Sequence, residues 1–174
     1  MAIDTAQKEL KPVNLKKAFV WAGVLVALDA FLLNQGVLSA LVGAWMLLVS
    51  LPRSAFNKSP EQRNRRFARI AIFLGAVMLV FGLNSANNQI ARKRAETLIT
   101  AIKAFKLKNQ RYPEKLSELV PDFIKYLPTA KYTLSFNSFH YVSGPESHSL
   151  FYVEMPPFGR PTYSFERGSW GYLD

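Results

Sequence analysis

One stretch of the chain, from Phe67 to Lys108, predicts a single long helix. Its first half has the composition of a membrane-spanning segment, and its second half that of a helix exposed to water on one side. Residues 67–83 are apolar apart from Arg69, whereas residues 84–108 are polar on one side and apolar on the other. The apolar half is close to the length of about 20 residues that crosses a bilayer. We therefore expect a helix that leaves a membrane and continues as the stalk of a domain in water.

The polar half of this helix carries a regular apolar stripe. Its members recur at spacings of four and three residues, with Ile99 beside them: Ala91, Ala95, Leu98, Ile102 and Phe105. Such spacing places the side chains on one face of a helix. We expect this face to pack on the domain's own core; a coiled-coil seam with a partner is the alternative, although only two heptads are present.

A second apolar region, residues 18–51, precedes the long helix and contains one charged residue, Asp29. It is too long for a single span, and Asn34-Gln35-Gly36 in its middle favours a tight turn. We predict a transmembrane hairpin with arms Ala18–Leu33 and Val37–Leu51. Asp29 is either an intramembrane polar site or a side chain close enough to the turn to reach the head-group layer.

The charges predict the orientation. The chain has 22 basic and 12 acidic residues, and six of the basic ones lie in Arg53–Arg69. Basic loops beside apolar spans stay in the cytoplasm. We therefore expect a bacterial inner-membrane protein whose basic arm (1–17) and loop (52–66) are cytoplasmic. The hairpin (18–51) and third span (67–83) would cross the membrane, and the domain (84–174) would be periplasmic. Membrane lipids are expected partners, and nucleic acid is not.

Beyond the stalk the pattern indicates a small α+β domain. Glu114–Val120 predicts a short helix with Leu116, Leu119 and Val120 on one face, ended by Pro121. Period-two patterns and β-branched or aromatic residues then favour four antiparallel strands. These are residues 132–136, Phe139–Val142, Leu150–Glu154 and Thr162–Glu166, and Arg167-Gly168-Ser169 closes the last of them.

The long helix followed by RYPEKLSELVPDFIKYLP and a small sheet resembles the type IV pilins and type II secretion pseudopilins. The similarity rests on the helix from Ala95 to Phe105, on Tyr112-Pro113 and on the leucine and proline residues that follow. It covers Phe67–Asp174 and implies a pilin-like roll outside the cytoplasm.

The chain departs from that family at the start of the helix. Pilins have a Gly before the first helical residue and a Glu five residues in, where this chain has Arg66 and Ala71. The acidic calcium-binding loop of major pseudopilins is missing too, and Ser169-Trp170-Gly171 is only a faint echo of their Asp-Pro-Trp-Gly motif. We therefore expect no processing: the hairpin stays attached and the helix is a permanent tether.

The sequence offers no catalytic constellation. His140 and His148 are the two histidines, and no ligand spacing joins them to Glu146 or Glu154. No nucleophile elbow, phosphate loop or dinucleotide-binding glycine pattern is present, and there is no cysteine. We predict a protein without enzymatic activity, cofactor or metal.

The C-terminus is rich in aromatic residues. Some must fill the core and others, with Arg160, form a candidate partner-binding surface: Tyr152, Phe158, Arg160, Tyr163, Trp170 and Tyr172. The first functional hypothesis is a displayed domain that contacts a protein partner in the membrane or periplasm, as an accessory factor of a secretion or pilus system. The alternative is a membrane-anchored immunity or inhibitor protein against a periplasm-acting toxin.

Overall fold

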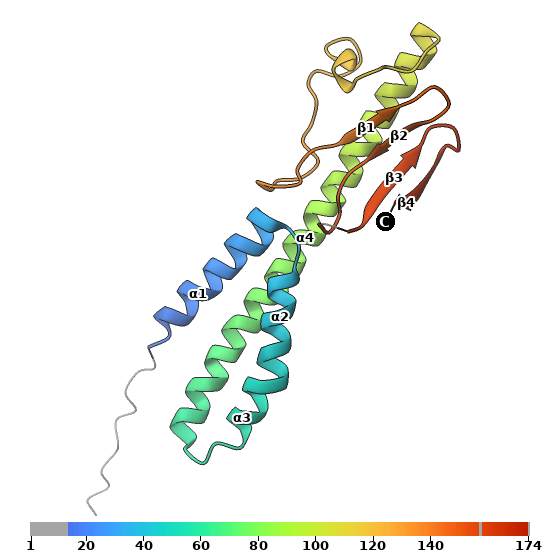
Figure 1. Cartoon of the computed structure of the whole chain (residues 1–174). Coiled ribbons are helices and arrows are strands. Elements are labelled where there is room, and N and C mark those ends of the chain that lie inside the picture. The colour runs from blue at the N-terminus through green and yellow to red at the C-terminus, as the bar shows by residue number, and fades with distance from the viewer. Residues whose placement is uncertain (1–13, 157, 174) are drawn as a thin grey trace, which may run out of the picture.

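The computed structural model describes residues 14–156 and 158–173, so most of the predicted arm 1–17 lies outside the described residues (Figure 1). Three helical segments form one end of the molecule, and a small sheet lies on the other half of the longest helix. The helical elements are α1 (Lys16–Val26), η1 (Ala27–Leu33), α2 (Val37–Trp45), η2 (Met46–Ser50), α3 (Leu51–Ala55), α4 (Pro60–Asn109) and η3 (Leu116–Leu119). The strands are β1 (His140–Ser143), β2 (His148–Phe151), β3 (Arg160–Ser164) and β4 (Ser169–Leu173).

Helix α4 is continuous over 50 residues, about 75 Å at 1.5 Å per residue. The prediction of one long helix is confirmed, although the helix begins at Pro60 rather than Phe67. Proline suits the first helical turn, because the amide it lacks would have no intrahelical acceptor there. At the other end Gln110 adopts a left-handed conformation (φ 59°) and its N–H donates to the carbonyl of Lys106.

The predicted hairpin is present as two helical arms joined at Asn34-Gln35-Gly36. The first arm runs through α1 and the π-helical η1, and the second through α2, η2 and α3. Asn34 and Gly36 have positive φ angles of 53° and 74°, which Asn tolerates and Gly adopts freely. Both arms pack against α4 in Figure 1. A side chain at position 36 would be crowded, since a Cβ there would lie 3.1 Å from Cε1 of Phe81.

The four strands form one antiparallel sheet in the order β1-β2-β3-β4. Tyr141 pairs with Leu150, Leu150 with Tyr163, and Tyr163 with Trp170. This cross-strand row faces the core, where Leu150 and Tyr163 are buried and the two outer aromatics are partly buried. The sheet therefore packs an aromatic row on the C-terminal half of α4.

The predicted strand at residues 132–136 is wrong. This segment forms bends, Tyr132 and Leu134 are exposed, and Phe136 has a φ of 55°. Its alternating pattern yields no ladder, because the segment lies on the hairpin: the N–H of Leu134 donates to the carbonyl of Phe31. The fourth strand is instead β4, which begins where the sequence pattern placed a closing turn; Gly168 makes that turn at φ 64°.

The apolar stripe of α4 is buried as predicted. Leu98 and Ile102 are fully buried and Phe105 nearly so, in one cluster with residues of the sheet. Ala91 and Ala95 are fully buried in the same cluster. The short helix after Pro113 is a single 3-10 turn that buries Leu119, whereas Val120 is 37% exposed, contrary to the prediction that it shares the buried face.

The helical end of the molecule has an unusually apolar surface. Two stretches, Val37–Ala55 and the helix Pro60–Asn109, are long and apolar enough to cross a membrane, and the first arm is not one of them. Large apolar side chains are exposed on both arms of the hairpin and on the apolar half of α4. Among them are Phe19, Trp21, Leu41, Trp45, Leu48, Met78, Leu79 and Phe81. Soluble monomers rarely expose a contiguous apolar surface of this extent.

Truncating the stripe tests the core. We expect Leu98→Ala to lower the free energy of unfolding of the domain by about 2 to 5 kcal/mol, because a fully buried leucine leaves a cavity. Leu107→Ala is the matched control, since Leu107 on the same helix is 78% exposed. Chemical unfolding followed by near-ultraviolet circular dichroism measures both. Equal effects would contradict the assignment of the buried face.

Candidate functional site

Asp29 ties the two arms of the hairpin together. Its side chain is fully buried in the first arm. One carboxyl oxygen accepts the N–H of Gly36 at 2.9 Å and the other accepts that of Ser39 at 2.7 Å. Those amides belong to the first turn of α2, where no intrahelical acceptor exists. Asp29 therefore caps the second arm from the first, a structural role that reasoning from its distance to the turn missed.

The tip of the hairpin also contacts the domain. The Leu134 N–H bond to Phe31 joins the loop at 129–139 to the end of the first arm at 2.8 Å. On α4, the buried side chain of Asn87 accepts the N–H of Tyr132 at 3.3 Å. The loop therefore rests on the hairpin and on α4 together.

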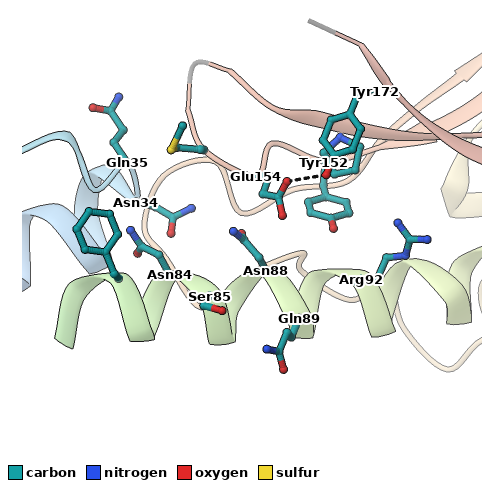
Figure 2. A pocket seen from close by; sticks show the side chains of 13 residues that line it. Asn34, Gln35, Asn84, Ser85, Asn88, Gln89, Arg92, Tyr152, Glu154 and Tyr172 are labelled. Carbon is teal, nitrogen blue, oxygen red and sulfur yellow. Dashed lines mark hydrogen bonds between the residues drawn. The ribbon is translucent and has the colours of Figure 1, made fainter. Parts of the chain in front are cut away.

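A cavity of about 440 Å³ lies at this junction (Figure 2). Its walls come from three parts of the chain: the hairpin turn, the middle of α4 and the edge of the sheet. The polar side chains that line it include Asn34, Asn84, Asn88, Arg92, Glu154 and Tyr172. Figure 2 shows Asn84, Asn88 and Arg92 along α4, with Glu154 and Tyr172 on the opposite wall. Phe81 and Met155 add apolar surface.

Several carboxamide atoms of this cavity have no hydrogen-bond partner among the described residues. Asn34 is 1% exposed, and neither its Oδ1 nor its Nδ2 is bonded. The Oδ1 atoms of Asn84 and Asn88 are likewise buried and unpaired. A buried polar atom without a partner costs about 1 to 3 kcal/mol. Such a group of atoms indicates a place that a polar ligand or water fills.

The cavity has one acidic and one basic side chain. The carboxylate of Glu154 accepts the phenol of Tyr172 at 3.1 Å. The guanidinium of Arg92 lies 3.6 Å from the ring centroid of Trp170, and its Nε donates to Glu96 at 3.3 Å. Trp170 donates to the same Glu96 oxygen at 2.9 Å. These contacts hold Arg92 at the edge of the sheet.

Arg94 makes a similar contact on the other side of the stalk. Its guanidinium lies 4.2 Å from the ring centroid of Tyr132 and donates to the carbonyl of Thr129 at 2.8 Å. Arg92 thus holds the sheet to α4, and Arg94 holds the loop to it. These contacts give a structural role to two members of the basic cluster Arg92-Lys93-Arg94, which follows the apolar half of the helix.

A buried lysine supports the wall behind Glu154. Lys131 is 1% exposed, and its ammonium donates to the backbone carbonyl of Glu154 at 2.7 Å. Burial lowers the pKa of Lys131 to about 8, against an opposing attraction from the Glu154 carboxylate. Burial likewise raises the pKa of Tyr152 to about 12.

The predicted aromatic surface is divided by the structure. Tyr152 and Tyr163 are buried in the core and cannot contact a partner directly. Tyr163 faces inward on β3, where it pairs with the partly buried Trp170, whereas Tyr152 is buried directly after the end of β2. The members left at the surface are Phe158 (68% exposed), Tyr172 (66% exposed) and Arg160.

The histidines serve the packing of the sheet. His148 lies 4.1 Å from Tyr112 between ring centroids and contacts Glu166 at 2.9 Å. Burial alone raises the pKa of Glu166, but hydrogen bonds from the backbone and ring of His148 outweigh it and leave the pKa lowered. His140 stacks on Phe151. Within residues 14–156 and 158–173, no three His, Asp or Glu side chains gather as a metal site does.

Comparison with known proteins adds no assignment. The chain matches no family model, no curated protein and no solved structure. Sequence reasoning missed Asn34, Asn84, Asn88 and Glu154 as members of one site. The signal that was available was the run Asn84–Gln89, rich in carboxamides directly after the apolar half of the helix.

The cap made by Asp29 can be tested by truncation. We expect Asp29→Ala to lower the thermal stability of the full chain in detergent by about 1 to 3 kcal/mol, because two buried amides lose their acceptor. Asp29→Asn retains one acceptor and should cost less. Asp122→Ala, at an exposed position, is the control. A neutral Asp29→Ala would contradict the cap.

Lys131 predicts a pH dependence. Between pH 8 and about 10.5 the unfolded chain keeps a proton that folded Lys131 has lost, so stability rises with pH. Relative to Lys131→Met, the wild-type chain should therefore gain about 1 to 3 kcal/mol across this window. Tyrosine ionisation affects both chains equally. Unfolding titrations at several pH values measure the difference, and a constant difference would contradict a depressed pKa.

Proposed function

We propose that this protein is a non-catalytic, membrane-anchored protein that presents its α+β domain for contact with a protein partner. The observation that carries the proposal is the fixed junction between an apolar helical unit and a folded domain. We place the helical unit in a bacterial inner membrane and the domain in the periplasm, where it would serve as an accessory factor of a secretion or pilus system.

Three features support the membrane anchor. Large apolar side chains cover the outside of the helical unit, while its one buried acid is fully occupied as a helix cap. Basic residues lie at one end of it, in Arg53–Arg69, as the positive-inside rule expects for a cytoplasmic loop. Phe19, Leu48 and Met78, at 62%, 76% and 75% exposure, would meet lipid rather than water in this arrangement.

The way the domain is held supports a role in display. The N–H of Leu134 donates to Phe31 of the hairpin and the N–H of Tyr132 donates to Asn87 of α4. The stacked Arg92 and Arg94 hold the sheet and the loop to α4. A domain held this way would present one fixed surface at a fixed distance from the membrane. Phe158 and Arg160 are both exposed and are separated in the sequence by Gly159 alone; aromatic and arginine side chains are typical interface anchors.

The proposed pilin-like role draws support from the stalk and the segment after it. The C-terminal half of α4 packs on an antiparallel sheet, and Tyr112 contacts His148 of that sheet and Phe165 directly after β3. Tyr112-Pro113 therefore has a structural role: it lies where the chain leaves the end of α4 and returns to the sheet. The attached hairpin favours an accessory factor over a filament subunit.

The proposal is tested with the full chain in its membrane. A phosphatase fused after Asp174 should be active and one fused near Ser59 inactive, because only the first would lie in the periplasm. A crosslinked pull-down from membranes should recover a secretion or pilus component. Phe158→Ala with Arg160→Ala should reduce this recovery, because the surface loses its two most prominent contacts.

The matched control for the surface is Tyr126→Ala. Tyr126 is 69% exposed, close to the 68% of Phe158, and lies in the loop before the sheet. It should leave recovery unchanged. The reverse phosphatase pattern would overturn the orientation. Recovery of a secreted toxin would replace the accessory role with that of an immunity protein, and full recovery with the surface variant would overturn the assigned surface.

A further inference from the structure

A basic pocket lies at the end of the helical unit that points away from the sheet. Figure 1 shows α3 beside the first turns of α4 at this end. The pocket between these two helices has a volume of about 260 Å³. Arg53 of α3 lines it on one side, and Arg66 and Arg69 of α4 line it on the other. Guanidinium groups from two separate helices therefore share one pocket.

The charges of these arginines are not neutralised by the rest of the described chain. Within residues 14–156 and 158–173, none of the three guanidinium groups has a hydrogen bond or an ion pair, and no acidic side chain lines the pocket. Glu61, the acid in the first turn of α4, is already paired with Arg65 at 2.8 Å. Like charges around one pocket repel each other, so a bound anion would be stabilised there. The planar fork of arginine matches the geometry of a phosphate.

Both walls of the pocket change from charged to apolar in the same direction. On α4, Arg66 precedes Phe73 by seven residues, or about 10 Å along the helix. The second arm of the hairpin runs antiparallel to α4, and there Met46 lies on the apolar side of Arg53 (Figure 1). A phospholipid whose phosphate lies at the arginines would therefore have its acyl chains on the apolar side of both walls, toward the interior of the membrane.

A neighbouring pocket places this end of the molecule at the boundary between lipid and water. It has a volume of about 460 Å³, shares Arg69 and Phe73 with the first pocket, and adds Lys17 and Trp21 from α1. Trp21 is 63% exposed, and tryptophan is enriched at the level of the lipid head groups. The arginines thus lie beside a side chain that is typical of the head-group layer.

We propose that the pocket lined by Arg53, Arg66 and Arg69 binds the phosphate of an anionic phospholipid, phosphatidylglycerol, in the cytoplasmic leaflet. The phosphate accepts hydrogen bonds from both walls, and the acyl chains follow Ile70 and Phe73. A head group without an ammonium fits best, because no acid of the described chain is present to pair with one. Basic pockets between transmembrane helices on the cytoplasmic side bind anionic head groups in other proteins. This inference rests on the proposed membrane anchor and its orientation.

Lipid retention by the purified full chain in detergent tests the site. The chain is incubated with equal amounts of phosphatidylglycerol and phosphatidylcholine and washed with detergent, and the lipid that stays bound is quantified by mass spectrometry. We expect about tenfold greater retention of phosphatidylglycerol, because the choline ammonium would lie among unpaired arginines. Inorganic phosphate in excess should not displace the lipid, since it has no acyl chains. Displacement would assign the pocket to a soluble anion and overturn the lipid site.

Matched double variants locate the site. Arg66→Gln with Arg69→Gln should lower retention of phosphatidylglycerol about tenfold, because charge-assisted hydrogen bonds to the phosphate are lost. Lys58→Gln with Arg63→Gln removes the same charge from the same basic segment outside the pocket lining, and should leave retention unchanged. Arg53→Gln, on the opposite wall, should also lower retention. An equal fall in both double variants, or full retention with Arg53→Gln, would overturn a site between the two helices.

The outcomes separate the lipid site from the membrane anchor. Alkaline extraction of membranes that contain the full chain tests the anchor independently of any bound lipid. Equal retention of phosphatidylglycerol and phosphatidylcholine by a chain that resists this extraction would overturn the lipid site and leave the anchor standing. Recovery of the chain in the soluble fraction would overturn the anchor and the lipid site together.

Discussion

The continuity of α4 is the constraint on which the rest of the structure depends. Because the backbone hydrogen bonds run unbroken over 50 residues, the apolar half and the amphipathic half cannot move independently by bending at a joint. The hairpin packs on one half and the sheet on the other. Their relative positions are therefore set by a single rigid element, and the junction between them keeps one geometry.

The junction turns this rigidity into a defined site. Asp29 accepts two amides at the start of the second arm and so fixes the conformation of the turn at Asn34. Because both arms pack on α4, the turn keeps one position along that helix. Arg92 and Arg94 hold the sheet and the loop from the other side. Each of these contacts joins segments far apart in the sequence. Together they leave a cavity with walls from three parts of the chain, whose unpaired amides are positioned by the hairpin turn and by α4, which explains how unpaired polar atoms persist there.

Reasoning from the sequence succeeded wherever one periodicity determined the structure. The stripe through Leu98 and Ile102 and the turn at Asn34-Gln35-Gly36 were predictable, because local spacing and turn chemistry agree with the tertiary fold. It failed at residues 132–136, whose strand-like alternation is overridden by a hydrogen bond from Leu134 to the hairpin. It also missed β4, because Trp170 and Tyr172 were assigned to a surface before the register that places Trp170 beside Tyr163 was known.

The site itself was not predictable for a more basic reason. Asn84 and Asn88 share a face of α4, but nothing in their spacing indicates that Asn34 and Glu154 complete the same cavity. In a sequence, carboxamides after an apolar helix are typical of a segment entering water. In the structure they lie beneath the sheet and against the hairpin turn, so the water that would satisfy them is largely excluded. The same residues thus line a cavity instead of a solvated surface, because the chain folds back over the point where its long helix leaves the apolar unit.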